Sequence, residues 1–212
     1  MPFDVVNEAT AANADLVAVL GLRLYARKEG EASWHDFGHV RTPQREQELT
    51  ELEIKSARLG RLATIKKVTT EASLEYTFES MSILDAATVG MHTGGPSGDG
   101  VVGDDAFYAV EEFLGTNAEL LIVQPNAETG GMMKFAYYPS AEIKGDGEES
   151  GDGENESTLT FRATILPAEG YTVPATLALS EPEAPFGYRY FAPASSETAV
   201  LDAISDGGYT AP

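Results

Sequence analysis

Two histidines lie at a spacing that is typical of a metal site. His35 and His39 are four residues apart, which on a helix would place both imidazoles on one face as metal ligands. The surrounding residues 33–40 (SWHDFGHV) favour extended chain instead, in which four residues span about 13 Å, too far for one ion. We therefore expect no metal site at this pair.

Two glutamates lie in the most regular pattern of the chain. In residues 73–79, polar residues at odd positions alternate with Leu74, Tyr76 and Phe78, which predicts a strand with one face in solvent. Paired carboxylates act as general acid and base where a closed pocket separates their pKa values. The sequence indicates no such pocket, so we interpret Glu75 and Glu79 as part of an exposed strand face.

A glycine-rich segment, residues 98–103, matches the dinucleotide fingerprint G-x-G-x-x-G. That fingerprint requires a preceding strand and a helix N-terminus that is free to accept phosphate, whereas here a Gly/Pro loop precedes it and Asp104 and Asp105 repel phosphate. The chain has no cysteine, which excludes thiolate nucleophiles and sulfur-ligated zinc. We expect a non-enzymatic protein with no catalytic residues, no metal and no cofactor.

The charge of the chain is strongly negative. Its 212 residues carry 34 acids and 14 bases, a formal net charge of −20. Such a field repels nucleic-acid backbones and excludes ordinary binding through Lys and Arg. Two uses of so many acidic residues remain: they could keep the protein soluble in high salt, or they could form a surface along which polyanions pass without adhering. No apolar run reaches the roughly 18 residues of a membrane span, so we expect no membrane partner.

The hydrophobic pattern predicts mainly strands, separated by turn-like breaks rather than by regular crossover helices. The expected strands cover residues 15–27, 33–40, 49–56, 62–70, 73–79, 119–124, 132–138, 158–166 and 171–179. The expected helices cover 82–92, 104–114 and 195–205. These elements predict a mainly β fold, an antiparallel β-sandwich or barrel-like subunit with a flanking short α-helix.

We expect residues 1–212 to form a single domain with four less regular parts. Pro43 argues against a central strand around it, and residues 145–156 are rich in Gly, Ser and acids. The acidic run resembles the opening of a calcium loop but carries Ser157 at the twelfth position, so weak divalent-cation binding stays open. The four parts are an N-terminal arm (about 1–14), a long loop (about 41–48), an acidic loop (about 145–157) and a C-terminal extension (about 188–212).

The order of segments in the first half resembles a known family. The segments are 34–40 (WHDFGHV), 52–61 (LEIKSARLGR), 66–78 (KKVTTEASLEYTF) and the short helix from Ser82, with a later strand at 159–165. Together they resemble the major tail tube proteins of long-tailed (siphovirus-like) bacteriophages and of tailed viruses of haloarchaea. The resemblance covers about half of the chain; residues 94–115, the acidic run and the chain from 188 onward have no counterpart.

The resemblance implies a structural virion protein. Subunits of this family join edge to edge into hexameric rings that close an inner β-barrel, and the rings stack into a tube that conducts the viral DNA. The expected partners are further copies of the chain, the tape measure and terminator proteins, and DNA that passes without specific binding. The expected location is the virion tail, assembled in the host cytoplasm.

On this interpretation, one set of acidic residues would line the lumen of the tube and one set of basic residues would contact the adjacent ring. Polar strand faces would line an acidic lumen, and the densest basic stretch would meet an acidic surface of the adjacent ring, with loop 41–48 ordering on stacking. The expected lumen residues are Glu51, Glu53, Glu75 and Glu79, and the expected inter-ring residues are Lys55, Arg58, Arg61, Lys66 and Lys67. The charge of −20 with scarce lysine further predicts a host with a salty cytoplasm, where screening makes mutual repulsion tolerable.

Two alternatives remain open at this point. One is another virion component of similar architecture: a tail terminator, a head–tail joining protein or a decoration protein. The other is a halophilic enzyme or carbohydrate-binding β-sandwich, which would need a pocket lined by aromatic residues. The clustered candidates for such a pocket are Tyr137, Tyr138, Tyr188, Tyr190 and Phe191.

Overall fold

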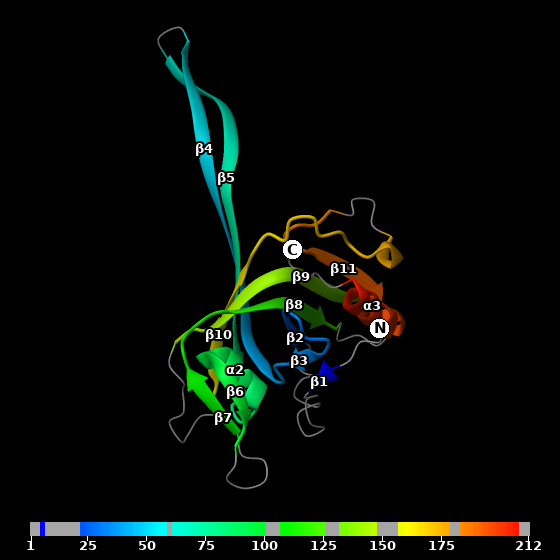
Figure 1. Cartoon of the computed structure of the whole chain (residues 1–212). Helices are drawn as coiled ribbons and strands as arrows, with labels where there is room; N and C mark the ends of the chain where they lie inside the picture. Colours follow the sequence, from blue (N-terminus) through cyan, green and yellow to red (C-terminus); the bar gives the residue numbers. More distant parts are fainter. Residues whose placement is uncertain are drawn as a thin grey trace.

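The computed structural model describes residues 5–6, 22–58, 61–100, 107–125, 132–147, 157–178 and 183–207, with the backbone alone at 5–6, 42, 49–58, 61–72 and 99. Figure 1 shows a curled sheet from which one hairpin projects far beyond the rest. The strands are β1 (Val5–Val6), β2 (Arg23–Lys28), β3 (Trp34–Asp36), β4 (Val40–Arg58), β5 (Arg61–Ser80), β6 (Gly94–Asp99), β7 (Phe107–Glu111), β8 (Thr116–Gln124), β9 (Met132–Gly145), β10 (Leu159–Ile165) and β11 (Tyr188–Pro193). The helices are α2 (Ala86–Thr93), α3 (Glu197–Asp206) and two 3₁₀ turns, η1 (Ala175–Leu177) and η2 (Ala194–Ser196).

The main sheet has the order β1-β3-β2-β8-β9-β10-β5-β4 and is antiparallel except for the β1–β3 pair. Strand β9 is long enough to pair with β10 through its second half and with β11 through its first half, while β8 lies along its other side. Strands β6 and β7 form a separate two-stranded sheet. The expected fold class, mainly β and barrel-like with a short helix, is confirmed.

Both faces of the sheet carry a core, because alternate residues of its strands point to opposite sides. On β9, Ala136 and Tyr138 face one core while Phe135 and Tyr137 face the other. The first core packs against α2 and includes Leu24, Phe37, Phe78, Met91 and Phe161. The second core is covered by α3 and the segment before it, and includes Trp34, Leu121, Tyr171, Val200 and Ile204.

Helix α2 is fixed at both ends by local chemistry. Asp85 is its N-cap, and its carboxylate accepts a hydrogen bond from the Thr88 N–H at 2.7 Å. Gly94 closes the helix with φ of 72°, a left-handed conformation that favours glycine. The predicted start at Ser82 is therefore wrong by one turn, because the Ser82 hydroxyl donates instead to the Phe37 carbonyl at 3.1 Å.

Helix α3, which confirms the predicted helix over 195–205, is tied to β2 by two arginines. Arg23 pairs with Glu197 in its first turn, and Arg27 donates to the Ser205 carbonyl in its last turn at 3.2 Å. Four strand residues and eight helical residues both span about 12–13 Å, so the spacing of the two arginines matches the helix. The helix thereby covers the second core.

Three predictions of local structure are wrong. Residues 41–48 are not a loop but part of β4, because β5 supplies a pairing partner along their length, with a register shift between Arg41 and Gln44 that accommodates Pro43. Residues 104–114 contain strand β7 rather than a helix, because β6 pairs with it. Residues 171–179 contain η1 rather than a strand, since Pro174 lacks the N–H that a strand interior needs.

Two other expected parts lie wholly or mostly outside the described residues. Of the N-terminal arm (about 1–14) only β1 is described, and of the acidic loop (about 145–157) only residues 145–147 and 157. The expected C-terminal extension contains β11, η2 and α3.

Candidate functional site

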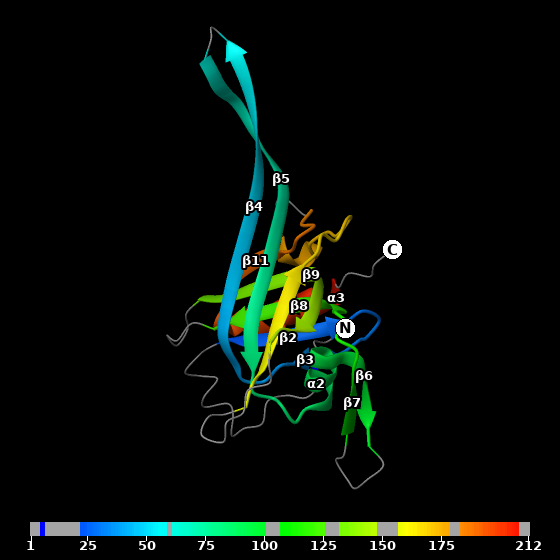
Figure 2. The same cartoon turned by 90° about the vertical axis from the view of Figure 1, so that its left-hand side faces the viewer.

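The most unusual feature of the chain is a projecting hairpin, formed by residues 48–58 of β4 and 61–73 of β5. Beyond Leu74, the last β5 residue that pairs with β10, the two strands have only each other as partners in the described sheet. At about 3.3 Å per residue, the β4 side of this hairpin extends roughly 36 Å. Figures 1 and 2 show it standing clear of the body in two views. A two-stranded ribbon of this kind is only marginally stable by itself.

The outer strand β4 is also a long edge. In the described sheet it has β5 as its partner along 19 residues and forms the end of the strand order. Residues 43–48 are all exposed, which means that both faces of β4 are in solvent there. Long exposed edges can pair with other chains, and here the β4 edge is interrupted by Pro43 and by three register shifts, between Arg41 and Gln44, Thr50 and Glu51, and Ile54 and Lys55.

The five bases expected to contact an adjacent ring all lie on the outer half of the projecting hairpin. Arg58 pairs with Arg61 at the end of the ladder, and Lys55, Lys66 and Lys67 follow within a few rungs. Of the expected lumen residues, Glu51 pairs with Thr69 and Glu53 with Lys67 on the same hairpin. The backbone alone is described for these seven charged residues.

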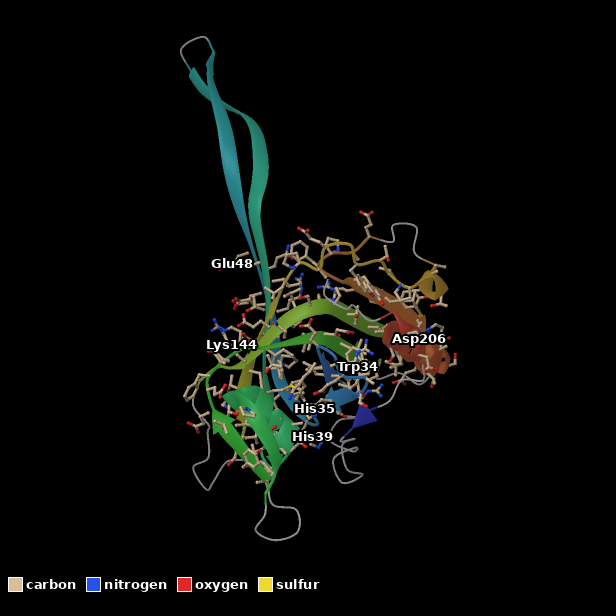
Figure 3. All side chains as sticks on the ribbon, in the orientation of Figure 1. Trp34, His35, His39, Glu48, Lys144 and Asp206 are labelled. Carbon is tan, nitrogen blue, oxygen red and sulfur yellow. The ribbon has the colours of Figure 1, made fainter. Side chains whose placement is uncertain are left out.

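Glu75 and Glu79, by contrast, lie on the body of the sheet. Their strand neighbours Tyr76 and Phe78 are buried in the first core, so the two glutamates face the opposite side, where they are partly exposed. The described helices pack over the first core or over the part of the second core near β2 and β8. They do not cover the side of β5 that carries Glu75 and Glu79. We call the polar side of β5, β10 and the second half of β9 the open face; in Figure 3, Lys144 of this face lies near the base of the hairpin.

Carboxylates form a row across the open face. Glu46 on β4 lies opposite Glu75, Thr164 on β10 lies on the other side of Glu75, and Glu142 on β9 follows Thr164. The Thr164 hydroxyl lies 3.5 Å from a Glu75 carboxylate oxygen. Glutamates directly opposite each other on neighbouring strands repel, so the row is held at a cost in stability.

A row of bases lies next to the carboxylates. Arg162 on β10 lies opposite Thr77 and Lys144, and its guanidinium lies 2.8 Å from Asp146 and 4.0 Å from Glu75. The hydrogen bond to Asp146 raises the pKa of Arg162. These groups are exposed enough that each pair contributes little stability, so the face is a hydrated surface with an excess of carboxylates.

His35 and His39 lie in extended chain, as expected. His35 is in β3 and His39 lies between β3 and β4, and both are buried. His35 Nε2 lies 2.8 Å from the Thr88 hydroxyl and 3.6 Å from Asp85, so it supports the start of α2. Burial lowers the pKa of His35, and the Asp85 charge opposes this shift. Across the described ranges, no three His, Asp or Glu side chains gather as metal ligands.

The five clustered aromatic residues serve mainly as core. Tyr137 and Tyr138 are buried in opposite cores, and Tyr188 and Tyr190 pack against the second core. Of the five, Phe191 is the exposed one. The glycine motif at 98–103 begins at the end of β6, and β7 follows rather than a helix. Two of the five aromatic residues, Tyr138 and Tyr188, also line a pocket together with Phe186.

Sequence reasoning missed one buried polar cluster. Arg27 Nη2 lies 2.7 Å from Glu119, whose carboxylate also accepts from the Tyr137 hydroxyl at 2.8 Å. The Arg27 guanidinium lies over Trp34, 4.7 Å from the ring centroid. Arg27 and Glu119 occur in separate strands and carry no sequence signal of pairing. The cluster is enclosed by the second core, so its role is to hold α3 and the sheet together.

No protein-family model and no curated protein sequence matches this chain. Among the helices of the described ranges, none has the length and apolarity that crossing a membrane requires.

Proposed function

We propose that this protein is a self-assembling structural subunit of a viral tail, the major tail tube protein of a long-tailed virus. Copies join into rings, six to a ring by the family resemblance, and rings stack into a conduit for DNA. The tape measure and terminator proteins are its further partners. It acts in the virion tail and performs no catalysis.

The observation that carries the proposal is the projecting hairpin. Roughly 36 Å of two-stranded ribbon has no support from its own body among the described residues, and residues 43–48 are exposed on both faces. Such a ribbon becomes stable when another copy packs against it. Its outer half carries five of the 14 bases of a chain with net charge −20, so the acidic surface of another copy is a suitable partner.

The open face supports a conduit. Its carboxylates, among them Glu75 and Glu142, repel phosphate, while Arg162 on the same face forms ion pairs with Asp146 and Glu75. A hydrated wall of this kind lets DNA slide without adhering. Closure of the sheets of several copies into one barrel also removes the long β4 edge.

Negative-stain electron microscopy and sedimentation of the purified chain test the proposal. In salt of about 1 M, where the Debye length falls to about 3 Å, we expect tubes; at about 0.1 M we expect assembly to fail because the copies repel. Single rings that never stack would indicate a terminator instead. Monomers at every salt concentration would refute self-assembly.

A further inference from the structure

One end of the body presents a short exposed segment of mixed chemistry. Residues 110–114 (VEEFL) are all exposed, with Phe113 78% and Leu114 58% accessible. The segment is nevertheless held in place, because the N–H groups of Glu112 and Phe113 both donate to the Thr93 carbonyl at the end of α2, at 3.0 and 2.7 Å. Two carboxylates flanked by three apolar side chains on a tethered backbone are suited to contact another protein.

The backbone at Phe113 supports this interpretation. Its φ is 55°, a left-handed conformation that is strained for a residue other than glycine. Strained residues persist where the surrounding structure holds them and are concentrated at functional sites. The Phe113 side chain, which is large and apolar, is mostly in solvent in this conformation.

A pocket of complementary chemistry lies at the base of the projecting hairpin. Its volume is about 550 Å³, and β4, β5, β9 and the start of β11 enclose it. We call it the basal pocket; its lining residues are Arg45, Gln47, Ser73, Leu74, Tyr138, Phe186, Gly187, Tyr188 and Arg189. None of these described lining residues is a carboxylate, although acids outnumber bases 34 to 14 in the chain.

The bases at the basal pocket repel one another. Lys134 lies nearby on β9; burial lowers its pKa, and the charges of Arg189 and Arg45 lower it further. Arg189 hydrogen-bonds to the Tyr138 and Tyr76 hydroxyls, which fixes its position. Because these hydroxyls are neutral, they do not balance the positive charge of Arg189. Three neighbouring cations favour a bound carboxylate. Phe186, which is 40% exposed, adds an apolar wall.

We infer that the basal pocket of one copy receives residues 110–114 of a second copy, with Glu111 and Glu112 meeting Arg45 and Arg189. The apolar side chains of the segment then pack against Phe186 and the neighbouring Phe191. This inference deepens the proposed function and rests on it, since the contact is one between stacked copies.

The positions of the two surfaces fit such stacking. Figures 1 and 2 place β6 and β7 on the side of the body away from the projecting hairpin, residues 110–114 lie where β7 returns to the end of α2, and the basal pocket lies where the hairpin begins. A head-to-tail contact between identical copies forms a ring where the rotation between copies closes and an open stack where it does not, and the proposed tube requires the open stack. The hairpin of one copy would then run beside the body of the copy seated on it.

Charge reversal tests the contact in the full-length chain at a salt concentration where the wild type assembles. Variant A is Arg45→Glu with Arg189→Glu, variant B is Glu111→Arg with Glu112→Arg, and variant C carries all four changes. The matched control is Lys28→Glu with Lys144→Glu, which changes net charge as variant A does at sites outside the contact. Sedimentation and electron microscopy report polymer length, and circular dichroism confirms that each variant is folded.

We expect variants A and B each to reduce polymer mass at least tenfold, while the control assembles as the wild type does. An equimolar mixture of A and B should polymerise, because each reversed surface then meets an opposite charge, and variant C should polymerise alone. The inference is refuted if variants A and B assemble normally. It is also refuted if variant A fails to assemble but variant B, the A–B mixture and variant C do not give the results expected above, because the basal pocket then binds something other than residues 110–114. If the wild type itself never assembles, the proposed function fails together with the inference.

Discussion

Removal of the Glu119 carboxylate is the sharpest test of how the body is held together. In Glu119→Ala, the Arg27 guanidinium would lose its partner at 2.7 Å while it remains 7% exposed beneath α3. An uncompensated buried charge costs about 3–5 kcal/mol, so we expect the free energy of unfolding to fall by that amount. The Tyr137 hydroxyl loses its acceptor in the same variant, which adds about 1 kcal/mol.

The same structure predicts that the pair itself contributes little net stability. Burial raises the pKa of Glu119 even though Arg27 and Tyr137 both lower it, which means that the desolvation penalty exceeds the attraction. The double variant Arg27→Met/Glu119→Leu should therefore be more stable than Glu119→Ala alone. A matched control is Glu197→Ala, which breaks the more exposed Arg23–Glu197 pair and should cost about 0–1 kcal/mol.

Urea denaturation at constant salt, followed by tryptophan fluorescence of Trp34, measures these differences, because Trp34 lies against Arg27. The reasoning would be wrong if Glu119→Ala cost less than about 1 kcal/mol. It would also be wrong if the losses of the two single variants, Arg27→Met and Glu119→Leu, simply added in the double variant.

Three further predictions follow from other parts of the fold. The pKa of His35 is lower in the folded chain than its usual 6.5, so the contribution of His35 to stability is complete above pH 6.5 and is lost as pH falls. In Asp85→Asn, NMR titration should show a His35 pKa that is lower still, because the Asp85 charge raises it. An unchanged or higher pKa would contradict the contact between His35 and Asp85. Gly94→Ala should lower the temperature of thermal unfolding more than Gly30→Ala does. Both glycines have a positive φ, but a Cβ at Gly94 would collide with the Leu114 backbone, whereas a Cβ at Gly30 would meet open space. Equal decreases in the two variants would argue against the close approach of Gly94 and Leu114. In a virus that carries this protein, Glu75→Lys with Glu79→Lys should leave tubes intact but slow DNA ejection, and unchanged ejection kinetics would place these residues away from the lumen.

The strands that form the body were largely predictable, because alternation survives wherever one face meets the core. The pattern at 73–79 correctly separated Tyr76 and Phe78 from Glu75 and Glu79, and the helix near the C-terminus was found from the spacing of Val200, Leu201 and Ile204. Local chemistry was sufficient in these places because side-chain periodicity records which face is buried.

The projecting hairpin was only half predicted. Its sequence predicts strands at 49–56 and 62–70. Residues 41–48 are part of β4, but their sequence is typical of a polar loop, because residues 43–48 are all exposed and no apolar alternation marks a buried face. Their strand conformation comes from pairing with β5, which a local pattern does not record. The helix expected at 104–114 failed for the same reason, since β6 imposes pairing on a segment whose apolar spacing suits a helix.

Four properties could be predicted from the amino-acid sequence: the β-rich class, the absence of cysteine chemistry, the negative charge and the alternation of the body strands. Only the folded structure shows that Tyr25 and Arg27, on the side of β2 opposite to Leu24 and Ala26, are also buried, because α3 returns from the far end of the chain to cover them. It also decided that Arg45 and Arg189 share one pocket although 144 residues separate them. Periodicity reports the polarity of a face along one segment, whereas the segment that covers a face, or leaves it open, is chosen by contacts between distant parts of the chain.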